Sequence, residues 1–145
     1  MKGILLSVDD EMVVLVALKE QLWNAFGDQH IIEVAQSGEE GLEILDDLVG
    51  DGYMPLVIIS DWLMPGMKGD EFLIEAHKRF PCVITVMLSG QADEASVRRV
   101  RQEARLHEFI AKPWDGDALI RCVREGLAQL ASPSPAEAPS YPAGS

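Results

Sequence analysis

The stretch of sequence that decides the fold is residues 55–66, Pro-Leu-Val-Ile-Ile-Ser-Asp-Trp-Leu-Met-Pro-Gly. Its apolar run, residues 56–59, ends close to the carboxylate of Asp61, and Pro65 and Gly66 prevent regular structure beyond it. A short run that is apolar on both faces and closed by turn residues is typical of an interior strand of a parallel sheet. We therefore expect Asp61 at the carboxyl end of a buried strand, facing an open crevice.

Four more runs of strand character alternate with helical patterns along the chain. The other predicted strands are residues 3–8, 30–35, 82–88 and 107–111. The predicted helices are residues 12–26, 37–49, 69–80, 93–105 and 115–130, with Ser37 and Asp115 as caps. Five βα units in strict alternation predict an α/β fold, the flavodoxin-like (βα)5 three-layer sandwich, with a parallel five-stranded sheet in the order 2-1-3-4-5.

Composition narrows the class of protein. A formal net charge of −12 argues against nucleic acid or an anionic membrane as a direct partner. Cys82 and Cys122 fall in apolar patterns, so we interpret them as reduced core residues. The sequence contains no long apolar span and no signal-peptide pattern at its start, so we expect a cytoplasmic protein. Residues 1–131 are predicted to form one domain, and residues 132–145, rich in Pro, Ser and Ala, a disordered tail or a linker.

Polar residues follow four of the predicted strands, and parallel strands bring them to one edge. These residues are Asp9, Asp10, Asp61, Ser89 and Lys112. Each has an ordinary structural interpretation when taken alone, since an aspartate can cap a helix or start an Asx turn. Together, on four strand ends around the crevice between the first and third strands, they indicate a site.

The chemistry of these side chains points to a metal and a phosphoryl group. Three carboxylates at close range repel one another unless one is protonated or a cation binds. Oxygen-only ligands suit a hard divalent cation, so we expect Mg²⁺. Lys112 and Ser89 suit phosphoryl oxygens, and a carboxylate can act as the nucleophile. The set predicts phosphoryl transfer onto an aspartate.

Residues 1–131 resemble a receiver domain of bacterial two-component response regulators. The resemblance rests on four segments: residues 8–11, Val-Asp-Asp-Glu; residues 60–69, Ser-Asp-Trp-Leu-Met-Pro-Gly-Met-Lys-Gly; residues 88–90, Leu-Ser-Gly; and residues 109–114, Phe-Ile-Ala-Lys-Pro-Trp. It implies that Asp61 accepts a phosphoryl group from a sensor histidine kinase or a phosphotransfer protein. It also implies a Mg²⁺ site, which Mn²⁺ can also occupy, formed by Asp10, Asp61 and the backbone carbonyl of Leu63, with Asp9 acting through water.

The resemblance assigns further roles near the site. Ser89 and Lys112 would hold the phosphoryl oxygens, and the Lys112–Pro113 bond would be cis. Phe109 stands at the aromatic switch position, where the ring turns inward as Ser89 moves toward the phosphate. Ser89 and Phe109 replace the more usual threonine and tyrosine. Leu63 and Gln91 occupy the positions that face attacking water, and we expect the apolar Leu63 to slow hydrolysis of the aspartyl phosphate.

The output surface is expected on the fourth helix, the fifth strand and the fifth helix. Arg98, Arg101 and Arg105 would give this face a positive charge next to Phe109. An ordinary solvated helix face explains the same pattern. The functional interpretation is a surface that binds a downstream effector protein or a fused output domain, or that pairs two copies as a homodimer.

Two other functions compete with a phosphorylation-controlled switch. A Mg²⁺-dependent phosphatase with Asp61 as the nucleophile needs a second aspartate two residues later, where this chain has Leu63. A nucleotide- or flavin-binding module needs a Gly-rich loop after the first strand, where this chain has Asp9, Asp10 and Glu11.

Overall fold

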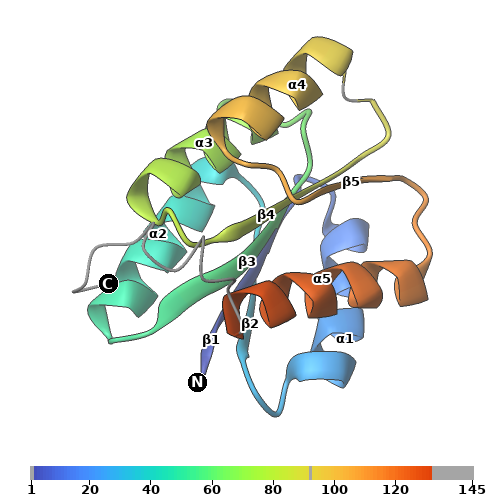
Figure 1. Cartoon of the computed structure of the whole chain (residues 1–145). Coiled ribbons are helices and arrows are strands. Elements are labelled where there is room, and N and C mark those ends of the chain that lie inside the picture. Colours follow the sequence, from blue (N-terminus) through green and yellow to red (C-terminus); the bar gives the residue numbers. More distant parts are fainter. Residues whose placement is uncertain (1, 92, 132–145) are drawn as a thin grey trace.

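The computed structural model describes residues 2–91 and 93–131 as five strands and five helices in strict alternation (Figure 1). The strands are β1 (Gly3–Val8), β2 (Ile31–Ala35), β3 (Met54–Ser60), β4 (Ile84–Ser89) and β5 (Glu108–Ala111). The helices are α1 (Met12–Phe26), α2 (Gly38–Gly50), α3 (Gly69–Arg79), α4 (Glu94–Glu103) and α5 (Gly116–Ala131). The tail predicted over residues 132–145 lies outside the described residues.

All neighbouring strands are parallel, and the sheet order is β2-β1-β3-β4-β5, which confirms the predicted fold class. Val8, the last residue of β1, pairs with Ala35 on one side and Ser60 on the other. The residues that follow β1 and β3 therefore leave the sheet side by side. This register positions Asp9 and Asp61 at the same edge.

Two hydrophobic cores, one on each face of the sheet, make the three layers. On one face α2, α3 and α4 pack through residues such as Leu45, Phe72 and Val100. On the other face α1 and α5 pack through residues such as Leu18 and Val123. Figure 1 shows the same division, with α1 and α5 together on one side of the strands and α3 and α4 adjacent on the other.

Local sequence accounts for the start of α2. The Ser37 hydroxyl accepts a hydrogen bond from the Glu40 N–H at 3.1 Å, which is the predicted cap of α2.

Cys122 is buried, and burial raises the pKa of its thiol to about 11, so it remains a protonated core residue as expected. No helix among the described residues has both the length and the apolar character needed to span a bilayer.

The structure corrects the end of the fourth helix. α4 ends at Glu103, whereas the sequence pattern predicts a helix as far as Arg105. Arg105 has a φ of +52°, a left-handed conformation that reverses the chain toward β5. Arg105 is therefore not part of the helix face on which it was predicted. Smaller differences concern strand starts: β2 begins one residue later than predicted, β4 two residues later and β5 one residue later.

Candidate functional site

The candidate site lies at the carboxyl edge of the sheet, where the backbone continues the strand pairing for one more residue. The N–H of Asp9 donates to the carbonyl of Ala35 at 3.1 Å, and the N–H of Asp61 donates to the carbonyl of Val8 at 2.9 Å. Both aspartates are nearly inaccessible to solvent, with exposed fractions of 1% and 6%. Their positions are thus fixed by the sheet and not by a free loop.

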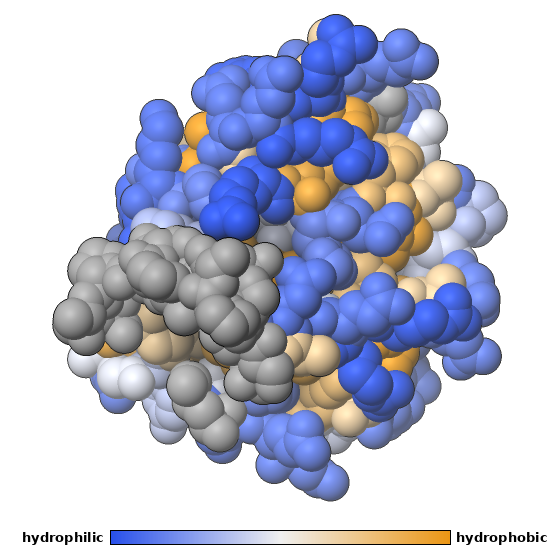
Figure 2. Space-filling model, viewed as in Figure 1, coloured by the Kyte–Doolittle hydropathy of each residue, from blue (hydrophilic) through white to orange (hydrophobic). Residues whose placement is uncertain are grey.

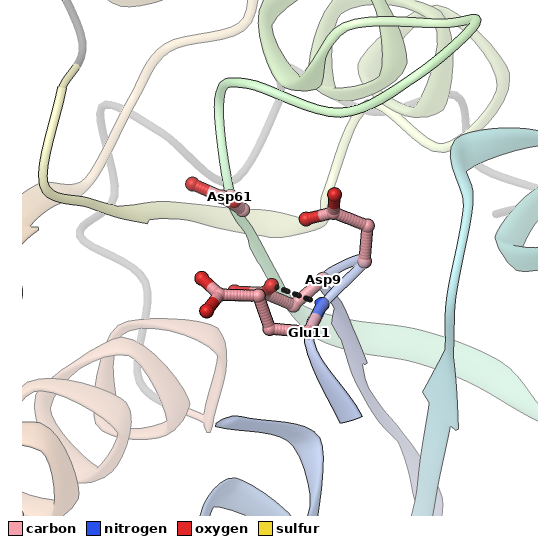
Figure 3. Close-up of side chains that lie close together, drawn as sticks. Asp9, Glu11 and Asp61 are labelled. Carbon is pink, nitrogen blue, oxygen red and sulfur yellow. Dashed lines mark hydrogen bonds between the residues drawn. The ribbon is translucent and has the colours of Figure 1, made fainter. Parts of the chain in front are cut away.

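Four carboxylates meet at this edge. Asp9, Asp10, Glu11 and Asp61 each offer an oxygen, and these oxygens lie within 4.8 Å of one another. Figure 3 shows Asp9 and Glu11, from the loop after β1, and Asp61, from the end of β3, gathered at one place. The Glu11 N–H donates to Asp9 Oδ1 at 2.8 Å, which holds the loop in this shape. The three predicted aspartates are brought together as expected.

Glu11 belongs to the acid cluster but was not among the site residues predicted from the sequence. It follows Asp10 directly and supplies the first residue before α1, without a side-chain cap of its own. Its proximity to Asp61 depends on the turn between β1 and α1, which strand-end reasoning does not specify. The run of three consecutive acids was the available signal.

Lys112 is the positive charge of the site, as predicted. Its Nζ lies 2.7 Å from Asp9 Oδ2, 3.5 Å from Asp61 Oδ2 and 3.5 Å from Glu11 Oε1. The peptide bond between Lys112 and Pro113 is cis, as the family resemblance implied. A residue that is about a hundred positions away in sequence thus joins the acids that follow β1.

The charges of the acid cluster favour binding of a cation in addition to Lys112. Burial tends to lower the pKa of Lys112, but the hydrogen bond to Asp9 and the charges of Asp9, Asp61 and Glu11 outweigh it and raise this pKa. Burial raises the pKa of the Asp9 carboxyl even though Lys112 bonds to it and opposes the rise. The Lys112 ammonium therefore does not fully offset the burial of the Asp9 carboxylate, and an all-oxygen donor set of this kind fits a hard divalent cation.

The backbone around Asp61 is held on both sides. The Trp62 N–H donates to Asp61 Oδ1 at 2.8 Å, and the Ser60 hydroxyl donates to the Asp61 carbonyl at 2.9 Å. The start of α3 closes on the same segment, because the Gly69 N–H donates to the Trp62 carbonyl at 2.8 Å. A Cβ at Gly69 would overlap the Asp61 carbonyl, so only glycine permits this approach.

Ser89 ends β4, is buried, and pairs with Ala111, the residue before Lys112. The Lys112 N–H donates to the Ser89 carbonyl at 3.3 Å, while the Ser89 hydroxyl accepts from the Gln91 N–H at 3.2 Å. Leu63 projects into solvent with 47% of its surface exposed, and Gln91 is exposed too. All strand-end residues predicted for the site therefore lie on one edge of the sheet.

Comparison with known proteins agrees with this geometry. The family described as response regulator receiver domain matches residues 5–124, which is most of the chain. The chain belongs to the response regulator receiver domain family. The predicted resemblance is thereby confirmed, and neither the phosphatase nor the nucleotide-binding alternative receives support.

Curated relatives of this receiver domain are much longer proteins. The chain is 33% identical over 122 residues to the hydrogenase transcriptional regulatory protein HoxA of Cupriavidus necator, covering 84% of this chain and 23% of that protein. It is 33% identical over 98 residues to the sensor kinase CckA of Brucella abortus, covering 68% and 10%. It is 28% identical over 127 residues to the DNA-binding transcriptional regulator NtrC of Escherichia coli, covering 87% and 25%. The chain thus spans about a quarter or less of these relatives.

Solved structures confirm the fold of the receiver domain. A response regulator receiver domain protein from Methanospirillum hungatei superposes with a TM-score of 0.79 at 24% identity, covering 90% of this chain and 98% of that one. An uncharacterised protein from Neptuniibacter caesariensis gives a TM-score of 0.73 at 31% identity, covering 87% of each. The strand order 2-1-3-4-5 found here is that of the flavodoxin-like fold, to which these structures also belong.

The predicted output residues of the receiver domain separate into two groups. Arg98, Arg101 and Phe109 line a surface hollow of about 440 Å³ together with Glu94 and Val97. In Figure 2 the upper part of this face, where α4 and β5 lie, shows apolar surface bordered by hydrophilic residues. Arg105, in the turn after α4, does not line this hollow, so the basic face is narrower than the sequence pattern predicted.

Proposed function

We propose that this receiver domain accepts a phosphoryl group on Asp61 from a histidine-phosphorylated kinase or phosphotransfer protein and controls an output partner through its α4–β5–α5 surface. The observation that carries the proposal is the position of Lys112. Its ammonium lies 3.5 Å from Asp61 Oδ2 and 2.7 Å from Asp9 Oδ2, at the rim where four carboxylates converge. A nucleophilic carboxylate, a metal-binding acid cluster and an ammonium are the parts that phosphoryl transfer needs.

The transfer exchanges one bond to phosphorus for another. An Asp61 carboxylate oxygen attacks the phosphorus of the donor's phosphohistidine, and an O–P bond forms as the N–P bond breaks. The electron pair of the broken bond stays on the imidazole nitrogen, and a proton on the other ring nitrogen makes the departing histidine neutral. Lys112 balances the charge on the phosphoryl oxygens, and the Ser89 hydroxyl donates to one of them. The hydrogen bond from Trp62 keeps the Asp61 carboxylate oriented throughout.

Mg²⁺ is the proposed cofactor, and Mn²⁺ can replace it. Asp10, Asp61 and the Leu63 carbonyl would hold the metal, with Asp9 bonded through water, and the buried Asp9 and Asp61 fit such a role. When bound, the metal draws charge from the phosphoryl oxygens and relieves repulsion among the carboxylates. The domain thereby assists its own phosphorylation and dephosphorylation and turns over no other substrate.

The partners follow from the family and remain part of the proposal. A cytoplasmic histidine kinase or phosphotransfer protein supplies the phosphoryl group. Because relatives such as HoxA and NtrC are transcriptional regulators several times longer, the controlled partner is either a fused output domain or a separate effector. In the switch, Ser89 and Phe109 would move together and change the hollow bordered by Arg98 and Arg101, where an effector or a second copy binds.

Phosphorylation from a small donor tests the proposal without a kinase. Incubation with acetyl phosphate and Mg²⁺ is expected to add the mass of one phosphoryl group, and removal of the metal with EDTA is expected to abolish the addition. The Asp10→Asn variant should need a higher Mg²⁺ concentration, whereas Asp51→Asn, in an exposed turn after α2, should match the parent. A mass increase that is equal with and without metal would contradict the metal-assisted mechanism.

Leu63 is expected to limit the approach of water to the aspartyl phosphate. Its exposed side chain stands two residues after Asp61 and offers no hydrogen-bonding group. Leu63→Asn should therefore shorten the half-life of the phosphorylated domain about tenfold, since an amide can position water for attack. Loss of the label over time after donor removal measures this, with the exposed Met54→Gln as control. Equal half-lives for Leu63→Asn and the parent would show that another group sets the hydrolysis rate.

A further inference from the structure

Asp70 is a buried carboxylate outside the phosphoacceptor site. It is the second residue of α3 and is only 6% exposed. Burying a carboxylate is costly unless hydrogen bonds or an opposite charge compensate it. The fold and the phosphoryl chemistry described above give this residue no task.

The compensation for Asp70 comes from two places. Asp70 Oδ1 accepts a hydrogen bond from the Glu71 N–H at 3.0 Å, at the start of its own helix. Asp70 Oδ2 faces α4, where Arg99 Nη1 lies 3.5 Å away. Arg99 also bonds to Glu103 on α4 itself, with Nε 3.1 Å from Glu103 Oε2. If the Asp70–Arg99 pair breaks, Arg99 thus still has Glu103 as an ion-pair partner. Asp70, in contrast, loses the positive charge that compensates its buried carboxylate.

α4 has fewer buried residues than the other helices, so its ion pair with Asp70 matters more for its position. Val100 is its only fully buried residue, so apolar packing holds it weakly. Its neighbour is α3, with which it lies side by side in Figure 1 and makes contacts. The ion pair from the half-exposed Arg99 to the buried Asp70 carboxylate is a polar link between α4 and α3 in addition to this apolar packing.

The start of α3 is also fixed to the phosphoacceptor segment. Gly69, which precedes Asp70, packs against the Asp61 carbonyl so closely that a Cβ would overlap it. The Gly69 N–H bonds to the Trp62 carbonyl. Contacts therefore connect the segment that follows Asp61 to the start of α3, where Asp70 lies, and Arg99 connects Asp70 to α4.

We propose that Asp70 and Arg99 form a latch that holds α4 in place and couples its position to the segment around Asp61. The latch is separate from the path through Ser89 and Phe109, because its two residues lie on α3 and α4. Its opening, in which Arg99 keeps only Glu103, frees α4 to change the hollow beside Phe109. The latch itself exists in the unphosphorylated domain, and its part in switching rests on the proposed function of Asp61.

Amide hydrogen exchange in α4, residues 94–103, tests the latch directly. In the unphosphorylated domain, Asp70→Asn and Arg99→Gln should each speed exchange in α4 by about threefold to tenfold, as expected for a coupled ion pair. The double variant should exchange no faster than the faster single variant, because both changes remove one interaction. Asp70→Asn leaves no stranded buried charge, so it keeps the test valid if Arg99→Gln is poorly folded.

Arg98→Gln serves as the matched control, since Arg98 precedes Arg99 on the same helix, and it is Arg99 that pairs with Asp70. Exchange in α4 that is the same for Asp70→Asn, Arg98→Gln and the parent would overturn the latch. In the switching test, phosphorylation should speed α4 exchange in the parent and much less in Asp70→Asn. An equal increase of α4 exchange in the parent and in Asp70→Asn would overturn the coupling. A parent that takes no phosphoryl group would contradict the proposed function instead. The exchange result for the unphosphorylated domain would still stand in that case.

Discussion

The Asp61→Asn variant is expected to lose phosphorylation by acetyl phosphate by a factor of about 10³ or more, because it removes the nucleophile of the reaction. An asparagine side chain keeps the oxygen that accepts the Trp62 N–H, so the segment after β3 retains its shape. It also removes one negative charge from a crowded set of acids, so the variant should be at least as stable as the parent without metal. The measurement is label incorporation at saturating Mg²⁺.

Two controls make the Asp61 result specific. Asp51→Asn removes an acid from an exposed turn distant from the sheet's carboxyl edge and should incorporate label like the parent. Thermal unfolding of Asp61→Asn should show a cooperative transition, which excludes loss of fold as the cause. Incorporation by Asp61→Asn at the parent's rate would mean that another residue accepts the phosphoryl group.

The second large effect is expected from Lys112→Met, which removes the only cation that the described residues place at the acid cluster. Without the ammonium, phosphorylation should slow about 10²-fold, the magnitude seen when one preorganised donor to a developing charge is lost. Asp9, with 1% of its surface exposed, also loses the partner that lies 2.7 Å away. Breaking such a buried pair should cost about 3–5 kcal/mol of unfolding free energy.

Metal provides a further test of the Lys112 result. Since a bound divalent cation compensates the same carboxylates, Mg²⁺ should restore part of the lost stability of Lys112→Met and raise its melting temperature more than that of the parent. Lys78→Met, at an exposed position of α3, is the matched control and should change neither quantity. A Lys112→Met domain with the parent's stability in EDTA would show that the Asp9 ion pair contributes little.

The strand-end reasoning succeeded because parallel sheets impose a simple rule. Residues that follow consecutive parallel strands share an edge, so Asp9, Asp61, Ser89 and Lys112 could be placed together without coordinates. The apolar run before Asp61 and the breakers Pro65 and Gly66 identified the central strand. Both signals are local, and local signals are what a single sequence carries.

The features that the sequence did not predict depend on how elements meet. Glu11 joins the acid cluster through the turn after β1, and Arg105 leaves α4 because the chain must reverse in a left-handed conformation. The sequence pattern assigned no partner to Arg99, but the packing of α4 on α3 directs it to Asp70. A residue's neighbours on another helix follow from rotation and crossing of the helices, which spacing along one helix does not determine.

Chemical mapping of the phosphorylated residue in the unmodified protein tests the central claim most directly. Borohydride reduces an aspartyl phosphate to homoserine, and mass spectrometry of the resulting peptides then identifies the position. After phosphorylation with acetyl phosphate and Mg²⁺, we expect homoserine at position 61 alone, with none when EDTA is present. Homoserine at position 9 or 10, or none at position 61 in a protein that carries the label, would contradict the account.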